Sequence, residues 1–587
     1  MATILRSEHP RPDRVRSCWQ TLNGAWAFAF DPERTGLHQQ WYRRTEFPLT
    51  IQVPFCYQSE LSGIHSQEHC DVVWYSREFA LSEAFAGQRI LLHFGAADYL
   101  TDVWLDGQYL GHHEGGYTPF SFDITDLVAA SGDGVFRLSV RCEDTLECQQ
   151  PRGKQSFHPE PFACWYTPVT GIWQSVWLEG VGDTYPVDVR LTPCIERASV
   201  RVEMKLNQLP KDGEIRLTVA FEGTPAARQT VAVTTDRRIC TEIFLRHDDR
   251  LEGIHLWYPG LPALYDLKIE TLCAGEVVDT LDTYFGMRKI SIEDGNILLN
   301  NGILYQRLIL DQGYWPDGLL TAPSDDALRR DVELTLQMGY NGARKHQKFE
   351  DPRYLYWADK LGLLVWGELP SAYCLCDEEK RNMMRDLAEA IRRDYNHPSL
   401  IAWVPLNESW GVPFIQSDPE AQALNDLLYQ LVHTLDGTRY VSGNDGWEQA
   451  KTDVVTAHDY TARPDQLRPE YQDTASLLRG RTGSGKLLTA HGYEHSGKPM
   501  LLTEYGGIAM QKDEGGDNWG YNGAVRDEAA FLQRFEAITQ AFKHMPGFSG
   551  YCYTQLTDVF QEVNGLLDMH RNPKVNLDEI RRINLSD

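Results

Sequence analysis

The chain has 587 residues, of which 42% are hydrophobic and 24% charged, so it is long enough to form two to four domains with ample cores. Its formal net charge of -27 repels polyanions, which argues against nucleic acid and anionic membranes as partners. The 12 cysteines show no framework spacing, and the N-terminus has no apolar run typical of a signal peptide. We therefore expect reduced thiols and a cytoplasmic location.

Residues 1–183 read as a β-sandwich, because short apolar or alternating segments are separated by Gly, Asp and Asn. The segments RILLHFGA, TDVWLDGQYLG and GVFRLSVRC are examples. Asp106-Gly107, inside the second of them, is typical of a tight hairpin turn. The length of this region favours a jelly roll over a minimal immunoglobulin unit.

Residues 184–289 contain a second set of strands, including SVRVEMKL, EIRLTVAF and YDLKIETL. About a hundred residues with six or seven strands match an immunoglobulin-like sandwich in size. The region lacks a cluster of polar or titratable residues, so we interpret it as a spacer.

Residues 290–587 alternate strands with helices, which predicts a (β/α)8 barrel. The predicted strands are ILYQRLIL, YNGARKH, GLLVWGELP, SLIAWVPLNES, TRYVSGND, DVVTAHDY, PMLLTEYGG and FSGYCYTQLTD. Helical stretches such as SDDALRRDVELTLQMG lie between most of them, and Ser324 is a candidate cap for this one. We expect the inserts at 461–498 and 507–525 to overhang the mouth of the barrel.

Active sites of such barrels gather at the C-terminal ends of the strands, and polar side chains follow nearly every predicted strand here. They are Asp311, Gln312, Arg344, His346, Glu368, Asn407, Glu408, Asn444, Asp445, His458, Tyr460, Glu504, Tyr505, Gln555 and Asp558. This distribution indicates a functional site at the mouth.

Glu408 and Glu504 stand out because each ends a very apolar strand and should face the mouth. Cleavage of a glycosidic bond needs an acid for the leaving oxygen and a carboxylate for the anomeric centre. Arg344 is the candidate cation that keeps the nucleophile ionised, Asn407 a candidate partner for a sugar hydroxyl, and Tyr505 a candidate to orient Glu504. The alternative is that either glutamate makes an ordinary ion pair at the rim.

Three barrel segments resemble signatures of glycoside hydrolase family 2: residues 341–346 (NGARKH), 394–409 (DYNHPSLIAWVPLNES) and 502–507 (LTEYGG). LNGAWAF, VWLDGQYLGHHEGGYTPFSFDIT and TGIWQSVWLEG also resemble the sugar-binding jelly roll of that family. The resemblance implies that Glu408 is the acid/base and Glu504 the nucleophile, in agreement with the residue pattern. Our first hypothesis is a retaining exo-β-glycosidase in which the jelly roll and the barrel loops close one end of the cleft. Such an enzyme removes terminal non-reducing β-linked sugars by double displacement.

The identity of the sugar is the least defined part of the resemblance. β-Glucuronidases of the family carry an Asn-x-Lys clamp for the sugar carboxylate, whereas the comparable place here holds Glu562-Val563-Asn564, which would repel a uronate. An Asn-x-Lys motif does occur later in the chain, at Asn572-Pro573-Lys574. Our first expectation is a β-galactosidase. β-Glucuronidase, β-galactofuranosidase, arabinosidase and β-mannosidase are the alternatives within the family.

A further group of polar and aromatic residues either contacts the sugar or holds a loop in place: Asp311, His346, Glu368, Asp445, Trp447, His458, Tyr460 and Trp519. We expect no metal and no cofactor. Residues 480–486 resemble a phosphate-binding loop but are not followed by its Ser or Thr. His491 and His495 have the spacing of a zinc site on a helix, but Gly492 and Gly497 would interrupt that helix.

A non-catalytic carbohydrate-binding protein on an enzyme scaffold is the rival hypothesis. A binding protein has no reason to keep both carboxylates, which argues against it. In either case the expected partner is a β-glycoside or oligosaccharide, and the sequence leaves a homo-oligomer open.

Overall fold

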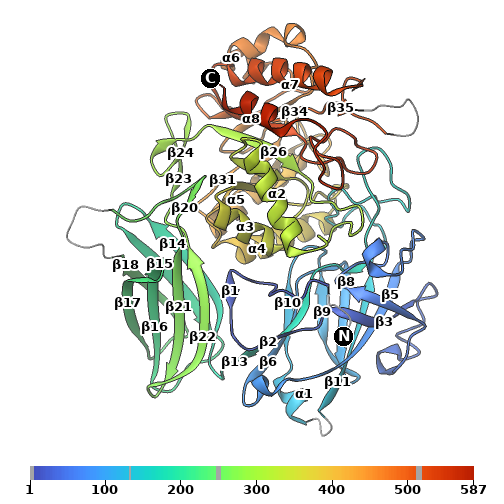
Figure 1. Ribbon diagram of the computed structural model, residues 1–587, viewed down its shortest axis with the longest axis vertical. Coiled ribbons are helices and arrows are strands. Elements are labelled where there is room, and N and C mark those ends of the chain that lie inside the picture. Colours follow the sequence, from blue (N-terminus) through green and yellow to red (C-terminus); the bar gives the residue numbers. More distant parts are fainter. Residues whose placement is uncertain (1–4, 131–133, 246–252, 511–517, 587) are drawn as a thin grey trace.

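The computed structural model describes residues 5–130, 134–245, 253–510 and 518–586, and it places two β-sandwiches against a barrel of strands and helices (Figure 1). The two sandwiches lie side by side at one end of the molecule, and the barrel forms the other end. The expected fold class is confirmed. None of the helices in these ranges combines the length and the apolar character needed to cross a bilayer.

The first sandwich contains a six-stranded and a four-stranded antiparallel sheet. Its strands are β2 (Trp19–Thr21), β3 (Gly24–Phe30), β4 (Leu49–Val53), β5 (Val72–Ala80), β6 (Arg89–Phe94), β7 (Ala97–Asp98), β8 (Leu100–Leu105), β9 (Gln108–Glu114), β10 (Phe120–Asp123), β11 (Val135–Glu143), β12 (Gly171–Ile172) and β13 (Val176–Val181). Short helices are η1 (Trp41–Arg43), η2 (Glu60–Ser62), η3 (Glu83–Phe85) and α1 (Thr125–Ala130).

The sheet orders are β4-β3-β5-β11-β8-β9 and β10-β6-β13-β2, and an apolar core from both sheets fills the space between them. Trp26 of the first sheet and Leu92 of the second are both almost fully buried in it. Asp106 and Gly107 have φ values of 47° and 77° and join β8 to β9 as a two-residue turn. The predicted hairpin is therefore confirmed.

The segment between β11 and β12, residues 144–170, leaves the first sandwich and lies on the barrel; we call it the jelly-roll loop. Arg152 and Gly153 donate their backbone N–H groups to the carbonyl of Ser371, at 2.9 and 3.0 Å. A Cβ on Gly153 would come within 2.1 Å of the carbonyl oxygen of Gln347, so the two backbones touch at a point where only glycine fits. The loop is thus part of the barrel surface.

The second sandwich is immunoglobulin-like and has sheet orders β14-β15-β18 and β1-β22-β21-β16-β17. Its strands are β14 (Pro186–Cys194), β15 (Ser199–Leu206), β16 (Gly213–Phe221), β17 (Thr224–Val233), β18 (Arg238–Phe244), β19 (Trp257–Tyr258), β20 (Leu261–Pro262), β21 (Tyr265–Cys273) and β22 (Glu276–Phe285). The strand β1 (Arg14–Val15) comes from the start of the chain and pairs with β22. The N-terminal segment therefore runs along the second sandwich before the first one begins.

The barrel is preceded by a small antiparallel sheet of β23 (Ile290–Glu293), β24 (Asn296–Leu299) and β25 (Gly302–Ile303). Its eight parallel strands are β26 (Gln306–Asp311), β27 (Gly342–Lys345), β28 (Leu364–Glu368), β29 (Leu400–Val404), β31 (Tyr440–Val441), β33 (Val455–Asp459), β34 (Met500–Gly506) and β37 (Phe548–Thr554). They follow the order β31-β29-β28-β27-β26-β37-β34-β33, so all eight predicted strands are present.

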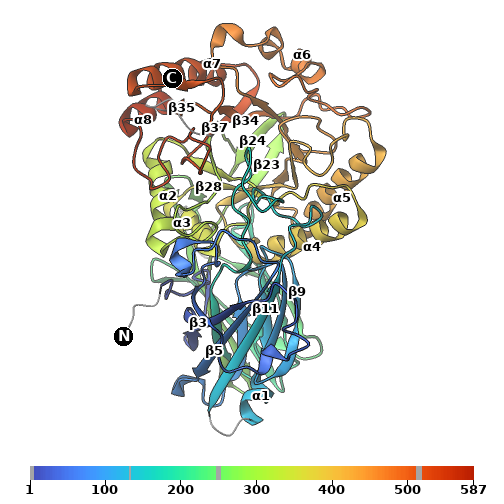
Figure 2. The same ribbon diagram turned by 90° about the vertical axis from the view of Figure 1, so that its right-hand side faces the viewer.

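Helices cover the outside of this sheet (Figure 2). They are α2 (Asp325–Gln337), α3 (Pro352–Leu361), α4 (Asp377–Asp394), α5 (Pro419–Leu435), α6 (Thr474–Arg479), α7 (Glu528–Lys543) and α8 (Leu577–Leu585). The hydroxyl of Ser324 accepts the N–H of Ala327 at 3.1 Å, so the predicted cap of α2 is confirmed. Apolar side chains between helices and strands form the largest core of the protein.

The two long inserts lie near the C-terminal ends of the strands. The first carries η4 (Pro464–Gln466), η5 (Pro469–Gln472) and α6, and Gly483 in it donates its N–H to Asp459 at the end of β33. The second carries β35 (Ala509–Met510) and β36 (Ala524–Val525), and its Tyr521 stacks on Tyr460 with ring centroids 3.4 Å apart. Residues 511–517 of this insert lie outside the described ranges. Both inserts border the mouth, as expected.

Candidate active site

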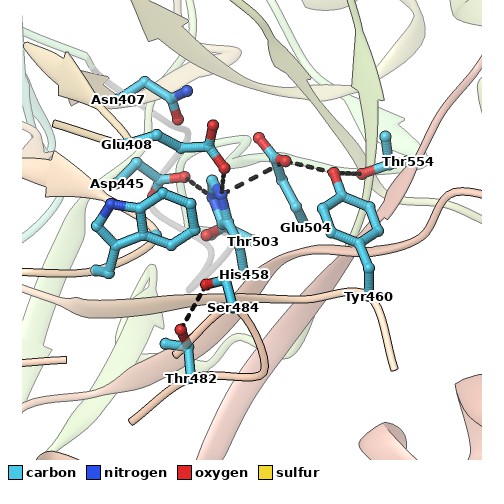
Figure 3. Close-up of polar contacts among 12 residues, drawn as sticks. Asn407, Glu408, Asp445, His458, Tyr460, Thr482, Ser484, Thr503, Glu504 and Thr554 are labelled. Atoms are coloured by element: carbon cyan, nitrogen blue, oxygen red, sulfur yellow. Dashed lines mark hydrogen bonds and ion pairs between the residues drawn. The ribbon is translucent and has the colours of Figure 1, made fainter. Parts of the chain in front are cut away.

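Glu408 and Glu504 meet at the mouth of the barrel (Figure 3). Each offers a carboxylate oxygen, and these two oxygens lie within 4.8 Å of one another. Glu408 follows the short strand β30 (Leu406–Asn407), which pairs with β32 (Asn444–Asp445), and its own N–H donates to the carbonyl of Asp445 at 2.9 Å. Its φ of 53° is unusual for a residue other than glycine and turns the carboxylate away from the strand direction.

Arg344 at the end of β27 is fully buried beneath the pair and holds Glu504. Its guanidinium donates to Glu504 Oε1 at 2.9 Å and to Glu368 Oε2 at 2.9 Å, and it lies 3.1 Å from Asp445 Oδ2. The expected cation beside Glu504 is therefore found. A buried guanidinium shared by three carboxylates is a costly arrangement that is characteristic of functional sites.

Glu368 and His346 also contact Arg344. Burial raises the pKa of Glu368 to about 7, against the opposing charge of Arg344. His346 Nδ1 lies 3.1 Å from Glu368 Oε1, and burial together with Lys154 and Arg344 holds the His346 pKa well below its ordinary value. The ring is accordingly neutral near pH 7.

Of the two polar side-chain atoms of Asn407, one has a hydrogen-bonding partner and the other has none in the part of the chain that the structure describes. Its Oδ1 accepts a hydrogen bond from Arg344 Nη2 at 2.6 Å. Its Nδ2 is buried and has no hydrogen-bonding partner among the described residues. A buried amide N–H without a partner is costly, so this donor is available for a ligand hydroxyl beside Glu408.

His458 at the end of β33 contacts both glutamates. Its Nδ1 lies 2.7 Å from Glu408 Oε1 and 3.4 Å from Glu504 Oε2, and its Nε2 lies 2.8 Å from Asp445 Oδ2 (Figure 3). Trp447 packs edge-on against the ring, with centroids 5.5 Å apart. These contacts place His458, Asp445 and Trp447 of the predicted site together.

Tyr460 holds Glu504, and Tyr505 does not. The Tyr460 hydroxyl donates to Glu504 Oε2 at 2.5 Å and lies 3.2 Å from the hydroxyl of Thr554. The Tyr505 hydroxyl instead meets the hydroxyl of Thr539 on α7 at 2.9 Å. The prediction that Tyr505 orients Glu504 is therefore wrong, because successive side chains of a strand point to opposite faces.

Asp311 and Trp519 lie at the edge of the site. Asp311 accepts a hydrogen bond from Lys345 Nζ at 2.7 Å and another from the N–H of Gly313, so it fixes the loop after β26. Trp519 donates its indole N–H to the carbonyl of Ala163 in the jelly-roll loop at 3.1 Å. The second insert and the jelly-roll loop therefore meet above the mouth.

The sequence interpretation missed the contribution of the jelly-roll loop. Lys154 in this loop is buried, and its charge acts on Glu408 and on Glu562, yet it forms no ion pair within 4.0 Å among the residues that the structure describes. Glu562, which follows β37, accepts hydrogen bonds from the hydroxyl of Tyr166 and from Gln312 Nε2. The signal in the sequence is the aromatic run from Phe157 to Tyr166, which fits no strand pattern.

Aromatic rings from the jelly-roll loop and the barrel adjoin Glu408. Phe162 stacks on Trp165 with centroids 4.8 Å apart, and Trp165 meets Trp410 edge-on at 5.1 Å. Trp410 is two residues beyond Glu408, and Tyr373 packs against both tryptophans. These rings form an aromatic wall beside the acid candidate.

Three patterns noted in the sequence make contacts within the protein. Lys486, in the phosphate-loop imitation, pairs with Glu448 at 3.2 Å. His495 lies 3.0 Å from the carbonyl of Gln449, and His491 lies beside Gln416. Lys574 of the later Asn-x-Lys letters pairs with Asp558 at 2.7 Å, and Asn572 donates to Asp568. These groups are thus engaged with the protein itself.

Comparison with known proteins gives matches along almost the whole chain. Three family models match in order: glycosyl hydrolases family 2, sugar binding domain, at residues 19–176; glycosyl hydrolases family 2 at 184–288; and glycosyl hydrolases family 2, TIM barrel domain, at 290–584.

Two curated relatives illustrate the sequence similarity. A β-galactosidase of Thermoanaerobacter pseudethanolicus is 25% identical over 452 residues, covering 75% of this chain and 56% of the relative. A β-glucuronidase of Paenibacillus borealis is 24% identical over 519 residues, covering 83% of each. The chain thus spans little more than half the length of the first relative.

Solved structures share the fold. A Lactobacillus rhamnosus β-glucuronidase has a TM-score of 0.78 at 19% identity, covering 100% of this chain and 99% of that one. A GH2 β-galacturonidase from Eisenbergiella tayi, bound to galacturonate, has a TM-score of 0.74 at 21% identity, covering 100% and 99%.

Proposed function

We propose that this chain, which belongs to family 2 of the glycosyl hydrolases, is a retaining exo-β-glycosidase with Glu504 as nucleophile and Glu408 as acid/base. The observation that carries the proposal is the approach of the two carboxylates to within 4.8 Å at the mouth of the barrel. Retaining enzymes hold this pair about 5 to 5.5 Å apart, whereas inverting enzymes need about 6.5 to 9.5 Å to admit a water.

Glu504 has the surroundings of a nucleophile. Arg344 and the hydroxyl of Tyr460 both donate hydrogen bonds to its carboxylate and hold it in place. In the first step Glu504 attacks the anomeric carbon while Glu408 gives a proton to the leaving oxygen. In the second step Glu408 takes a proton from water, which attacks the same carbon and releases Glu504.

The exo action is supported by what borders the mouth. The jelly-roll loop and the second insert meet there through Trp519 and the carbonyl of Ala163. The aromatic wall that includes Trp165 and Trp410 lies on the Glu408 side, where the leaving group departs. A terminal sugar would occupy the closed side and its leaving group the aromatic side.

For the identity of the sugar, a neutral β-galactoside is the first candidate. Glu408, Glu504 and Glu562 give the site an acidic character that disfavours an anionic sugar, and one of the curated relatives is a β-galactosidase.

A β-linked hexuronide is the second candidate, and Lys154 favours it. A buried ammonium group without an ion pair is costly, and a substrate carboxylate would supply the missing partner. Several relatives and structural neighbours are β-glucuronidases, and one is a β-galacturonidase.

Glu504→Gln tests the enzyme proposal, with Glu536→Gln on the exposed surface of α7 as the matched control. Glu504→Gln should lower hydrolysis of aryl β-glycosides by about 10⁴-fold or more while the control keeps full activity. A 2-fluoro sugar should label Glu504 in the wild type. Full activity of Glu504→Gln would remove this residue from the mechanism.

A substrate panel decides between the sugars: aryl β-galactoside, glucuronide, galacturonide, mannoside, arabinoside and galactofuranoside. If the second candidate is correct, Lys154→Met should lower the hydrolysis of uronides far more than that of neutral substrates, which it affects only through the loss of a charge that acts on Glu408. If Lys154→Met affects both equally, Lys154 does not read a carboxylate. If the wild type hydrolyses none of these substrates but still binds sugars, a carbohydrate-binding protein is favoured.

A further inference from the structure

His458 lies between the nucleophile and the acid/base, and its hydrogen-bonding partners favour a positive charge on the ring. Asp445 is ion-paired with Arg344, so its Oδ2 accepts and His458 Nε2 must carry a proton. His458 Nδ1 faces one oxygen of Glu408 and one of Glu504 at 2.7 and 3.4 Å. When both glutamates are ionised, a neutral ring would direct its Nδ1 lone pair at these oxygens, so in that state the ring is an imidazolium that donates on both sides.

The electrostatic surroundings agree with this assignment. Burial opposes the charge on His458, but Glu504, Asp445 and Glu408 outweigh it and raise the His458 pKa to about 10. The other titratable groups that act on this cluster include the cations Arg344 and Lys154, the neutral ring of His346, the phenols and thiols of Tyr460, Tyr521, Cys164 and Cys552, and the carboxyl groups of Glu368 and Glu562. Protonation therefore persists through the whole neutral range.

The ring cannot leave this position easily. Gly446 lies against it, and a Cβ at Gly446 would come within 2.7 Å of His458 Cε1 and Nδ1. Trp447 covers another side of the ring, and the N–H of His458 donates to the carbonyl of Gly446 at 3.2 Å. The cation is therefore part of the rigid barrel end.

We propose that His458 is a positioning residue, a fixed cation shared by the two catalytic carboxylates, which moves the pH range of activity toward acid. This inference rests on the proposed function of Glu408 and Glu504. Two carboxylates this close normally repel each other, so that one of them retains its proton into the neutral range. The shared imidazolium cancels that repulsion and lets both ionise together.

The direction of the Glu408 shift follows from the same contacts. Burial raises the pKa of Glu408, but the hydrogen bond and charge of His458, followed by Lys154 and Arg344, lower it below its ordinary value. Glu408 therefore keeps the proton that it gives to the leaving group only at lower pH. The ionised Glu408 that takes a proton from water in the second step is favoured. The apparent pKa values of the activity profile belong to the pair.

The test is the pH profile of kcat/KM in His458→Gln, which removes the charge and keeps a side-chain hydrogen-bond donor. An opposite charge within about 4 to 6 Å shifts a carboxyl pKa by about 1 to 3 units, so both limbs should move upward by about one pH unit or more. A residue with a merely structural role would lower the rate at every pH without moving either limb, and that result overturns the inference.

Tyr460→Phe is the matched control because it removes a neutral donor from Glu504 and no charge. Its acid limb should move upward while its alkaline limb stays in place. If His458→Gln does not fold, the smaller His458→Asn replaces it in the same measurement.

A measurement without turnover separates the two proposals. In the wild type, the imidazole ¹⁵N signal that disappears in His458→Gln should remain that of an imidazolium above pH 8. If it titrates near pH 6.5, this inference is wrong even if the enzyme is active. A wild type that is inactive on all glycosides but keeps the imidazolium signal would refute only the proposed function, while the charge assignment stands.

Discussion

The mouth of the barrel and the second sandwich use charged residues in opposite ways. At the mouth, the side chains of Arg344 and Asp445 are 0% exposed and lie 3.1 Å apart. In the second sandwich, Lys268 and Asp282 lie 3.6 Å apart with side chains 52% and 57% exposed. Exposed pairs contribute little to stability, whereas buried pairs are costly to form and costly to break.

This difference separates residues kept for folding from residues kept for chemistry. The second sandwich is held by an apolar core that includes Ile215, Leu217 and Ile269, and its exposed charges serve solubility. The mouth places carboxylates, guanidinium and imidazolium where solvation is lost, which stability alone does not require. The following substitutions test this comparison, from the largest expected effect to the smallest.

Arg344→Met should have the largest effect, because it leaves Glu368, Asp445 and Glu504 without their shared cation. We expect the free energy of unfolding to fall by about 3 to 5 kcal/mol, together with loss of activity. Chemical denaturation measures it. Arg201→Met, in an exposed pair of the second sandwich, is the control and should change stability by less than about 1 kcal/mol. Equal effects of the two variants would contradict the comparison.

Gly446→Ala should have the next largest effect. Gly446 has a φ of 101°, and an added Cβ would press on the ring of His458. Backbone strain and overpacking together should cost about 2 to 3 kcal/mol and displace the imidazolium. Thermal unfolding measures the loss of stability, and the pH profile of activity reports the displacement of His458. Gly223→Ala, in an open turn of the second sandwich at a φ of 77°, controls for strain alone.

Glu379→Gln examines a carboxyl that is buried without a counter-charge, at the start of α4. Neither of its carboxyl oxygens has a hydrogen-bonding partner within the described ranges, and burial raises its pKa to about 8. The native state thus binds a proton that the unfolded state loses above about pH 4.3, so wild-type stability should fall between about pH 5 and pH 8.

In Glu379→Gln the loss of unfolding free energy between pH 5 and pH 8 should be smaller by about 2 kcal/mol. This is less than the whole pKa shift of Glu379 would give, because local rearrangement and solvent screen the charge. Denaturation at pH 5 and pH 8 measures it. The same pH dependence in variant and wild type would mean that Glu379 ionises without difficulty in the native state.

Lys268→Ala should have the smallest effect, within about 0.5 kcal/mol, because the pair with Asp282 is exposed and screened by salt. Denaturation at low and high salt measures it. A loss above about 2 kcal/mol would show that charges of the second sandwich contribute to its stability after all.

The architecture and the two glutamates could be predicted from the sequence because both follow from short-range patterns. Most barrel strands are buried and have a polar residue at or just beyond their C-terminal end, and Arg344, Glu408 and Glu504 occupy such positions. The sequence could also have excluded Tyr505 as a hydrogen-bonding partner of Glu504. Since side chains alternate along β34, Tyr505 must face the helix layer when Glu504 faces the mouth.

Contacts that join distant segments could not be predicted in the same way. Nothing in the local pattern around Lys154 indicates that it lies near Glu408, more than two hundred residues further along the chain. The imidazolium state of His458 likewise depends on carboxylates from three other strands or strand ends. Such charge states are properties of the assembled barrel end.

The seating of the jelly-roll loop on the barrel, through Arg152 and Gly153 against Ser371, has a consequence for protein engineering. A ligand at the mouth of the barrel would adjoin two domains at once. A chimaera that took its first domain from a relative would exchange the jelly-roll loop while keeping both glutamates. Substrate preference could then be altered by recombining whole domains, without any substitution in the barrel.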